Sequence, residues 1–346
     1  MKNLRGAVIG CGFWSNYQIP AWLELEGVQL VALYNRTLSK ADELARQYNI
    51  PSTYNNAGLL LENENLDFID IVTDVDTHFF FTEMAARKGI AVICQKPMAP
   101  GFEEASQMIR ACRHADVPFF IHENFRWQLP IRKVKEALDN NLIGKPFKAK
   151  VSFCSAFPVF DNQPALRELE HFIITDIGSH LLDVCRFLFG EVESLYCQTQ
   201  RINANIKGED VANVFLKMKS SLHCYVEMSY ASLLEKESFP ETLMLIEGER
   251  GSIQLTHHFM LKITTPEGTI DTLIEPKQYR WADKDYAVVH SSIVDCNRNI
   301  LQALQGQDIA ETTGADNFET VKLVWACYES AKNNQVILLD NFKENY

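Results

Sequence analysis

The 346-residue sequence predicts a parallel α/β domain followed by an α+β domain. Up to about residue 124, short apolar runs alternate with segments of helical period, which is typical of a parallel sheet covered by helices on both faces. Beyond that point several runs of strand character follow one another with turn residues between them, which indicates a large, mostly antiparallel open sheet. We therefore expect two domains, residues 1–124 and 125–346.

The bulk composition excludes several classes of protein. A hydrophobic content of 47% supports packed cores, and a net charge of −12 without a basic cluster argues against nucleic acid as a direct partner. No apolar run approaches the ~18 residues of a membrane span, and the first residues already have strand character, so we expect neither a membrane span nor a signal peptide. The nine cysteines are scattered, with no C-x-x-C pair, which favours reduced thiols and a cytoplasmic protein.

The apolar periodicity places the elements of each half. In the first half we expect strands at residues 7–9, 28–34, 66–73, 90–94 and 117–122, and helices at 15–24, 38–48, from 74 on, and at 102–114. In the second half we expect helices at 131–140, 175–189, 287–305 and 316–333, a polar and aromatic loop at 156–172, and strands at 147–155, 192–202, 212–218, 222–229, 242–247, 252–256 and 261–264.

The segment that follows the first strand reads Gly-Cys-Gly-Phe-Trp-Ser from Gly10 to Ser15. Gly10 allows a tight turn, and Gly12 allows backbone to approach a pyrophosphate at the start of the next helix. Ser15 stands where the third glycine of G-x-G-x-x-G would be, so the match is incomplete. The position between a strand and a helix nevertheless favours a dinucleotide-binding Rossmann domain over an ordinary tight turn.

The end of the second strand bears on the choice of dinucleotide. An acidic residue is usual here in NAD-selective sites, roughly 20 residues past the glycines, but the sequence has Asn35 followed by Arg36. Without the acid the site can admit a 2′-phosphate, with which Arg36 could pair. Arg36 could equally be a solvated turn residue. We expect NAD or NADP, with a slight preference for NADP.

Several polar residues come at strand ends, where ligands of parallel sheets bind. Asn35, Thr73, Lys96 and Glu123 all follow strands of the first half. Lys96 precedes a proline, which restricts its backbone to extended conformations, and burial there would lower the pKa of its amine. An ordinary surface lysine after a strand remains the alternative.

A helix in the second half carries Asp176, His180 and Asp183, at spacings that place them on one face. A histidine beside carboxylates suits proton transfer. A buried, hydrogen-bonded histidine remains an alternative, as does a metal site of His171, Asp176 and His180, but no usual metal spacing is present and we predict none.

These motifs together resemble the Gfo/Idh/MocA family of nicotinamide-dependent oxidoreductases. Besides the glycine turn, the resemblance rests on T-x-x-x-x-H at residues 73–78, Gln-Lys-Pro at 95–97 where the family has Glu-Lys-Pro, E-N-F-R at 123–126, and D-x-G-x-H-x-x-D at 176–183. It covers essentially the whole chain.

The resemblance implies hydride transfer between NAD(P) and a secondary alcohol or carbonyl of a sugar, inositol or related polyol. It implies that Lys96, Asp176 and His180 are catalytic: one of Lys96 and His180 takes the hydroxyl proton and the other polarises the oxygen. Asp183 would support the catalytic residues without contacting the substrate itself. The cofactor-binding residues would be Gly10, Gly12, Phe13, Trp14, Asn35, Arg36, Thr73, His78, Gln95, Lys96 and Asn124. The resemblance also implies homodimers or homotetramers formed through the C-terminal sheet.

Two other functions remain open. The chain could be a glycoside-cleaving enzyme of the same fold in which NAD is reduced and reoxidised within one turnover. It could also be a non-catalytic NAD(P)-binding sensor, against which the presence of Lys96, Asp176 and His180 argues.

Overall fold

In the computed structural model, residues 3–342 are described, and the chain divides into two compact units. The first contains residues 3–124 and 278–321. The second contains residues 125–277 and 322–342. No helix within residues 3–342 is long and apolar enough to cross a membrane.

The first unit is built on a six-stranded parallel sheet in the order β3-β2-β1-β4-β5-β6. Its strands are β1 (Leu4–Ile9), β2 (Val28–Tyr34), β3 (Ser52–Tyr54), β4 (Phe68–Ile71), β5 (Ala91–Gln95) and β6 (Phe119–His122). Its helices are α1 (Ser15–Leu23), α2 (Leu38–Tyr48), α3 (Ala57–Asn63), α4 (His78–Ala86), α5 (Phe102–His114) and α9 (Ala287–Leu304).

The strand order reverses direction at β1 and β4. The chain runs from β1 outward to β3 and then returns to place β4 on the other side of β1. Helices that leave adjacent strands toward opposite faces open a crevice at the carboxyl ends of those strands, and ligands of such sheets bind there. The predicted Rossmann topology is therefore confirmed, and the point where the strand order reverses lies beside the glycine turn that follows β1.

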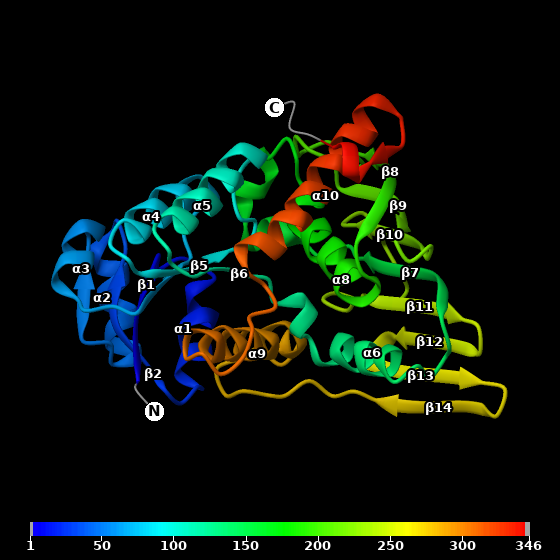
Figure 1. The fold of residues 1–346 in the computed structure, drawn as a ribbon, viewed down its shortest axis with the longest axis horizontal. Coiled ribbons are helices and arrows are strands. Elements are labelled where there is room, and N and C mark those ends of the chain that lie inside the picture. The colour runs from blue at the N-terminus through cyan, green and yellow to red at the C-terminus, as the bar shows by residue number, and fades with distance from the viewer. Residues whose placement is uncertain (1–2, 343–346) are drawn as a thin grey trace. The chain divides into compact units, whose positions relative to one another are not determined.

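The division of the chain differs from the predicted one at α9, which is expected in the second domain. Residues 278–321 group with the first unit. α9 packs along α1 (Figure 1), where the rings of Tyr17 and His290 stack with centroids 4.1 Å apart and Gln18 Nε2 lies 3.2 Å from Asn297 Oδ1. The apolar period of α9 predicts a helix but carries no information about which sheet it covers.

The second unit is built on a nine-stranded sheet in the order β14-β13-β12-β11-β7-β10-β9-β8-β15. β7 and β10 pair in parallel and the other neighbours run antiparallel, so the sheet is mostly antiparallel, as predicted. Its strands are β7 (Pro146–Cys154), β8 (Val192–Gln200), β9 (Val211–Met218), β10 (His223–Ser229), β11 (Leu243–Gly248), β12 (Gly251–Thr256), β13 (Met260–Thr265), β14 (Gly268–Leu273) and β15 (Ile337–Leu338).

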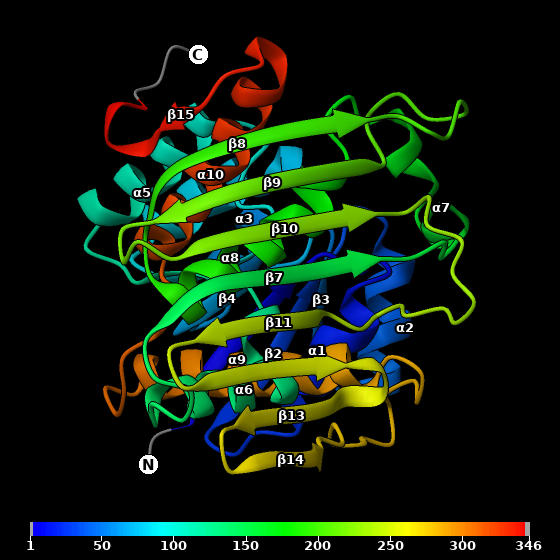
Figure 2. The ribbon, with the colours of Figure 1, turned by 90° about the vertical axis from the view of Figure 1, so that its right-hand side faces the viewer.

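Helices cover one face of this sheet. α6 (Leu129–Asp139) packs on β12 and α8 (Ser179–Phe189) packs on β10. α10 (Gly314–Asn333) begins in the first unit and ends in the second. Figure 2 shows the other face of the strands without helices over it. The predicted loop at 156–172 contains a short helix, α7 (Val159–Asn162), and a 3₁₀ turn (Pro164–Glu168).

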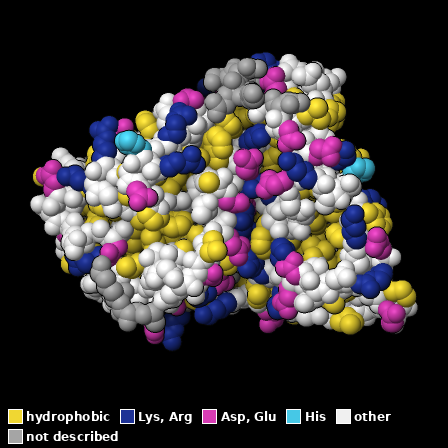
Figure 3. Space-filling model, in the orientation of Figure 1, with side chains coloured by type: hydrophobic (Ala, Val, Ile, Leu, Met, Phe, Trp, Pro, Cys, Tyr) yellow, Lys and Arg dark blue, Asp and Glu magenta, His cyan; other side chains and the backbone are white. Residues whose placement is uncertain are grey.

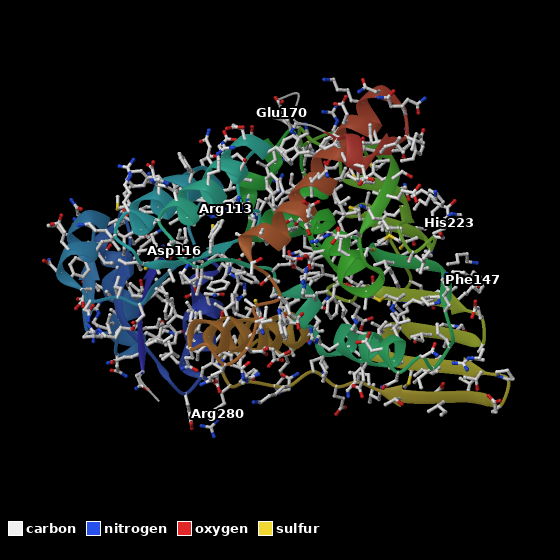
Figure 4. The ribbon with its side chains drawn as sticks, viewed as in Figure 1. Arg113, Asp116, Phe147, Glu170, His223 and Arg280 are labelled. Atoms are coloured by element: carbon white, nitrogen blue, oxygen red, sulfur yellow. The ribbon has the colours of Figure 1, made fainter. Side chains whose placement is uncertain are left out.

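The uncovered sheet face carries exposed aromatic and charged side chains. Phe147 and Tyr225 are 52% and 56% exposed, and Lys150 and Glu227 form an ion pair of 2.7 Å across β7 and β10. Figure 4 shows Phe147 and His223 at the starts of these strands, pointing away from the helices. On the molecular face drawn in Figure 3, basic and acidic side chains are interspersed.

Candidate active site

The glycine turn after β1 leaves room for a ligand's phosphates. Gly10 has φ +112°, and a Cβ there would lie 2.6 Å from the carbonyl oxygen of Val72, so glycine is required. A Cβ on Gly12, by contrast, would meet no atom within 4 Å. The Ser15 hydroxyl donates to the Gly12 carbonyl at 2.6 Å, so it closes the turn where the third glycine was expected.

This turn fits the pyrophosphate of a dinucleotide. Gly12 is exposed and opens onto free space, and α1 begins three residues later at Ser15, so the positive end of the helix dipole lies at this turn. Phe13 is 49% exposed at the same turn, whereas Trp14 is half-buried against Tyr17, with ring centroids 5.8 Å apart. Gly12 and Phe13 are therefore accessible to a cofactor.

Asn35 connects the glycine turn to the end of β2. Its Oδ1 accepts from the backbone N–H of Cys11 at 3.1 Å, and its Nδ2 donates to the Thr37 carbonyl at 2.9 Å. Arg36 is exposed beside it. Asn35 thus uses both ends of its amide within the protein, and Arg36 is accessible to an adenine ribose or its phosphate.

His78, predicted to contact the cofactor, lies instead inside the first unit. It is 1% exposed, its Nδ1 lies 3.1 Å from the Pro97 carbonyl and 3.2 Å from that of Met98, and its Nε2 lies 3.1 Å from the carbonyl of Thr73. Burial lowers the pKa of His78, and the carbonyl contacts oppose that effect. Because its ring joins the segments after β4 and β5, His78 positions the loop around Lys96 rather than offering a group to a ligand.

Asn124 is likewise buried, and it connects the end of β6 to α9. It is 2% exposed, and its Nδ2 donates to Ser292 Oγ at 2.8 Å in α9. Thr73 accepts at its hydroxyl from that of Thr77 at 2.7 Å and is half-buried at the end of β4. Gln95, 8% exposed, ends β5 and donates from Nε2 to Gln18 Oε1 at 3.3 Å.

Lys96 is half-buried immediately after β5, in the loop that His78 holds. Its peptide bond to Pro97 is cis. This placement at the carboxyl end of a central strand agrees with the prediction that Lys96 follows a strand at the ligand-binding edge of the sheet. Lys96 belongs to the first unit, and Asp176 and His180 belong to the second.

Asp176 lies on a π-helical turn, Ile174–Gly178, that leads directly into α8. The predicted face of Asp176, His180 and Asp183 assumes an unbroken α-helix, so the register between Asp176 and His180 differs from the expected one. π turns inside helices are frequent at functional sites. Tyr230, whose hydroxyl donates to Asp176 Oδ2 at 3.1 Å, fixes the carboxylate, and burial together with Asp176 raises the pKa of Tyr230 well above its usual value. Tyr230 therefore remains a donor at all working pH values.

His180 is 4% exposed at the start of α8. Its ring stacks face to face on Phe125, with centroids 3.8 Å apart and planes 5° apart. Asp183, one turn further along α8, accepts from Arg126 at both oxygens: Nε donates to one at 2.7 Å and Nη2 to the other at 2.5 Å. Asp183, which is predicted to support the site, thus forms an ion pair with Arg126, and both side chains are almost fully buried.

Glu209 is a supporting residue that the sequence did not reveal. Its Oε1 accepts from the backbone N–H groups of Phe172 at 3.2 Å and Ile174 at 3.3 Å, and from the hydroxyl of Tyr328 at 2.8 Å. Glu209 thus caps the segment that carries Asp176. No spacing in the sequence signals this contact, because α8 and β8 lie between Glu209 and the first two partners and Tyr328 is 119 residues away.

The metal alternative involves His171, Asp176 and His180. His171 is exposed and packs on Tyr328, with ring centroids 4.3 Å apart. Among residues 3–342, no three His, Cys, Asp or Glu side chains are grouped as metal ligands.

Comparison with known proteins identifies the family. The profile of the "Oxidoreductase family, NAD-binding Rossmann fold" matches residues 4–123, and that of the "GFO/IDH/MocA C-terminal domain" matches residues 131–254. A D-apiose dehydrogenase from Rhizobium rhizogenes is 40% identical over 337 residues, which cover 97% of this chain and 98% of that protein. This chain belongs to the Gfo/Idh/MocA family.

Other relatives agree with this assignment. A D-apiose dehydrogenase from Paraburkholderia graminis is 39% identical over 343 residues, which cover 99% of this chain and 92% of that protein. The crystal structure of an oxidoreductase from Agrobacterium radiobacter, in complex with NAD+, L-tartaric acid and magnesium, is 39% identical and has a TM-score of 0.97, covering 99% of this chain and 100% of that one. The predictions of an oxidoreductase with an NAD-binding Rossmann domain are thus confirmed.

Proposed function

We propose that this Gfo/Idh/MocA protein is an NAD-dependent dehydrogenase of D-apiose or of another aldose of similar size. The observation that carries the proposal is the similarity to two D-apiose dehydrogenases along almost the whole chain, at 40% and 39% identity. Similarity of that extent includes the second unit, in which the proposed substrate groups lie.

The residues of the first unit that would hold NAD follow from its accessible strand ends. The turn from Gly10 to Ser15 would take the pyrophosphate on backbone N–H groups, and Asn35 and Arg36 would border the adenosine ribose. Gln95 and Lys96, at the end of β5, would border the nicotinamide. When bound, NAD accepts a hydride from the carbon that bears the reacting hydroxyl.

The chain's own part in the reaction is to manage the hydroxyl proton. We assign Lys96 and His180 to the reacting oxygen, one accepting its proton and the other hydrogen-bonding to it. Asp176, fixed by Tyr230, would hold the sugar through its carboxylate, which accepts hydrogen bonds from hydroxyls. The flat contact with Phe125 would keep the imidazole of His180 in one orientation.

We propose NAD rather than NADP, against the slight preference that Arg36 suggested. Support comes from the NAD-binding description of the family and from the NAD+ in the Agrobacterium radiobacter structure. Arg36 is exposed and Asn35 is engaged within its own turn, so neither forms a preformed pocket for a 2′-phosphate.

We also propose a homodimer or homotetramer formed through the uncovered face of the second sheet, and a cytoplasmic location. The exposed Phe147 and Tyr225 on that face support an interface, and nine free thiols suit a reducing compartment. Sedimentation of the wild type and of Tyr225→Glu tests the interface, since a charge on a buried contact should shift the protein toward monomer.

Absorbance of reduced nicotinamide tests the activity. D-apiose, other aldoses, inositols and polyols would each be incubated with NAD and with NADP. The proposal expects the highest kcat/KM with D-apiose or a near relative and NAD. A higher kcat/KM with NADP would overturn the cofactor assignment. Release of sugar from glycosides without net NADH, together with no redox signal from the panel, would favour the glycoside-cleaving alternative.

A further inference from the structure

A group of buried polar side chains connects the middle of the first sheet to the end of β5. Asp70 lies within β4 and is fully buried, as is Gln18 of α1. Gln95, the last residue of β5 and the neighbour of Lys96, is the third member and is 8% exposed. All three belong to the first unit.

Asp70 is the fixed end of this group because a carboxylate can only accept hydrogen bonds. Its Oδ2 accepts from Gln18 Nε2 at 2.7 Å and from the indole N–H of Trp22 at 2.6 Å. Burial raises the pKa of Asp70 to about 6, so the group is ionised in slightly alkaline buffer.

The direction of each amide follows from that acceptor. Gln18 must turn its nitrogen to Asp70, so its oxygen faces the other way and accepts from Gln95 Nε2 at 3.3 Å. Gln95 in turn must present its nitrogen to Gln18, which leaves its oxygen directed away from that contact. The same Gln18 nitrogen lies 3.2 Å from Asn297 Oδ1 on α9, which agrees with this direction.

The buried polar side chains of Asp70, Gln18 and Gln95 do not maximise the stability of the first unit. Within residues 3–342, neither Asp70 Oδ1 nor Asn297 Nδ2 has a hydrogen-bond partner, and each such buried atom costs free energy. A buried carboxylate without a cationic partner is also costly, and apolar side chains of similar volume are often more stable. Because these buried groups lower the stability of the fold, we infer that they are present to orient the side-chain amides.

We propose that Asp70, acting through Gln18, sets the orientation of the Gln95 amide so that its side-chain oxygen is the group presented beside Lys96. The three residues are a positioning relay in which one acceptor-only carboxylate determines the direction of two amides. This inference rests on the proposed function, in which the end of β5 borders the nicotinamide. There the Gln95 oxygen would accept from an N–H donor of the ligand.

The relay makes a specific demand on position 95. A glutamate there has no N–H to give to Gln18, so Gln18 would face two carboxylates with one nitrogen and one oxygen, and it could satisfy only one of them. The double variant D70N/Q95E moves the carboxylate from position 70 to position 95 and lets Gln18 reverse. The new amide at position 70 then donates to the Gln18 oxygen, and the Gln18 nitrogen donates to the new carboxylate at position 95.

The experiment is a double-mutant cycle of D70N and Q95E in the full-length protein, followed by thermal unfolding and by NAD binding from the quenching of protein fluorescence. We expect Q95E to lower Tm by several degrees, because the N–H group that donates to Gln18 is lost and Gln18 then faces two carboxylates. D70N alone leaves both amides able to reverse, so it should weaken NAD binding severalfold, and it should not lower Tm because it removes the cost of the buried carboxylate. The double variant should recover part of the lost Tm, because Gln18 again faces one amide and one carboxylate, while the indole N–H of Trp22, which donates to the same oxygen of Asp70, loses its acceptor.

Gln18→Leu separates the relay from direct repulsion between two carboxylates. In a Q18L background the coupling between positions 70 and 95 should vanish, since nothing transmits the direction. Coupling that persists in Q18L would overturn the proposal in favour of simple repulsion. A double variant that is as unstable as Q95E, or that does not fold, would overturn it as well.

The controls keep this test independent of the substrate assignment. Thr82→Val removes a buried polar group of the same unit that takes no part in the relay, and it should leave NAD binding unchanged. If the wild type oxidises no sugar, the proposed function fails while the unfolding cycle still decides the relay. If the wild type is active and the cycle shows no coupling, the relay fails and the proposed function stands.

Discussion

The rings of Phe125 and His180 lie face to face, 3.8 Å between centroids and 5° between planes. The contact covers one flat side of the imidazole and so restricts its rotation. Phe125→Leu keeps most of the apolar volume but removes the flat contact, which is worth about 0.5–1.5 kcal/mol. We expect kcat to fall about 3- to 10-fold while the dissociation constant of NAD is unchanged. Phe102→Leu, a similar change of a ring paired with Phe318 in the first unit, is the matched control.

Tyr230→Phe should affect the sugar more than the cofactor. It removes the hydroxyl that donates to Asp176 Oδ2 but leaves the ring that packs on Phe172. A hydrogen bond to a charged group is worth about 1.5–3 kcal/mol, so kcat/KM for the sugar should fall at least about tenfold. Tyr196→Phe, which removes an exposed hydroxyl contact, should leave it unchanged. An unchanged kcat/KM in Tyr230→Phe would show that Asp176 needs no orientation.

The pair of Arg126 and Asp183 should behave as a buried ion pair, with side chains 5% and 0% exposed. Arg126→Met removes the cation from this pair, which should cost about 3–5 kcal/mol of unfolding free energy. The double variant Arg126→Met with Asp183→Leu should recover most of that loss. Urea denaturation measures both, and a double variant less stable than the single one would contradict this account.

Alanine at Gly10 should lower the stability of the protein, whereas alanine at Gly12 should weaken the binding of NAD. Gly10→Ala places a Cβ against the Val72 carbonyl at a left-handed φ, so unfolding free energy should fall by about 1–3 kcal/mol. Gly12→Ala meets open space, so the protein without ligand should keep its Tm but bind NAD more weakly. Differential scanning fluorimetry with and without NAD separates the two effects.

Asp70 should give stability a pH dependence of unusual sign. Its pKa is raised by burial from 3.8 to about 6, so the folded protein holds the proton more tightly than the unfolded chain. Unfolding free energy should therefore fall as pH rises through this window and level off above about pH 6. The difference corresponds to about 3 kcal/mol. Asp70→Asn should lack this contribution, and equal pH profiles for the two proteins would contradict the raised pKa.

The sequence predicted most elements of both units because their burial is periodic. β2, α2 and α5 have the expected bounds, since each is either a continuous apolar run or a helix with one apolar stripe. β14 was missed because all six of its residues are exposed, so it shows no alternation of buried and exposed positions. The pairing of α9 with α1 could not be predicted, since periodicity reports a buried face and not its partner.

In the candidate site, too, the sequence predicts the residues at strand ends but not the contacts between distant parts of the chain. Gly10, Asn35, Thr73 and Lys96 lie at strand ends as predicted, because the carboxyl ends of parallel strands share one edge. The bond of Tyr230 to Asp176 and that of Arg126 to Asp183 span 54 and 57 residues, so no local spacing signals them. His78 is predicted to bind the cofactor, whereas its two ring nitrogens lie against backbone carbonyls, and a histidine that binds a ligand and one buried beside the site are alike in sequence.

The grouping of α9 with the first unit has a consequence for synthesis. The sheet of that unit is complete at residue 122, yet the helix that covers α1 ends only at residue 304, after the whole second sheet except its short last strand has been made. During synthesis on the ribosome, the apolar side of α1 therefore stays uncovered by α9 while about half of the chain is made. We expect a nascent chain that ends before α9 to need chaperones, although the strands of its parallel sheet are all present.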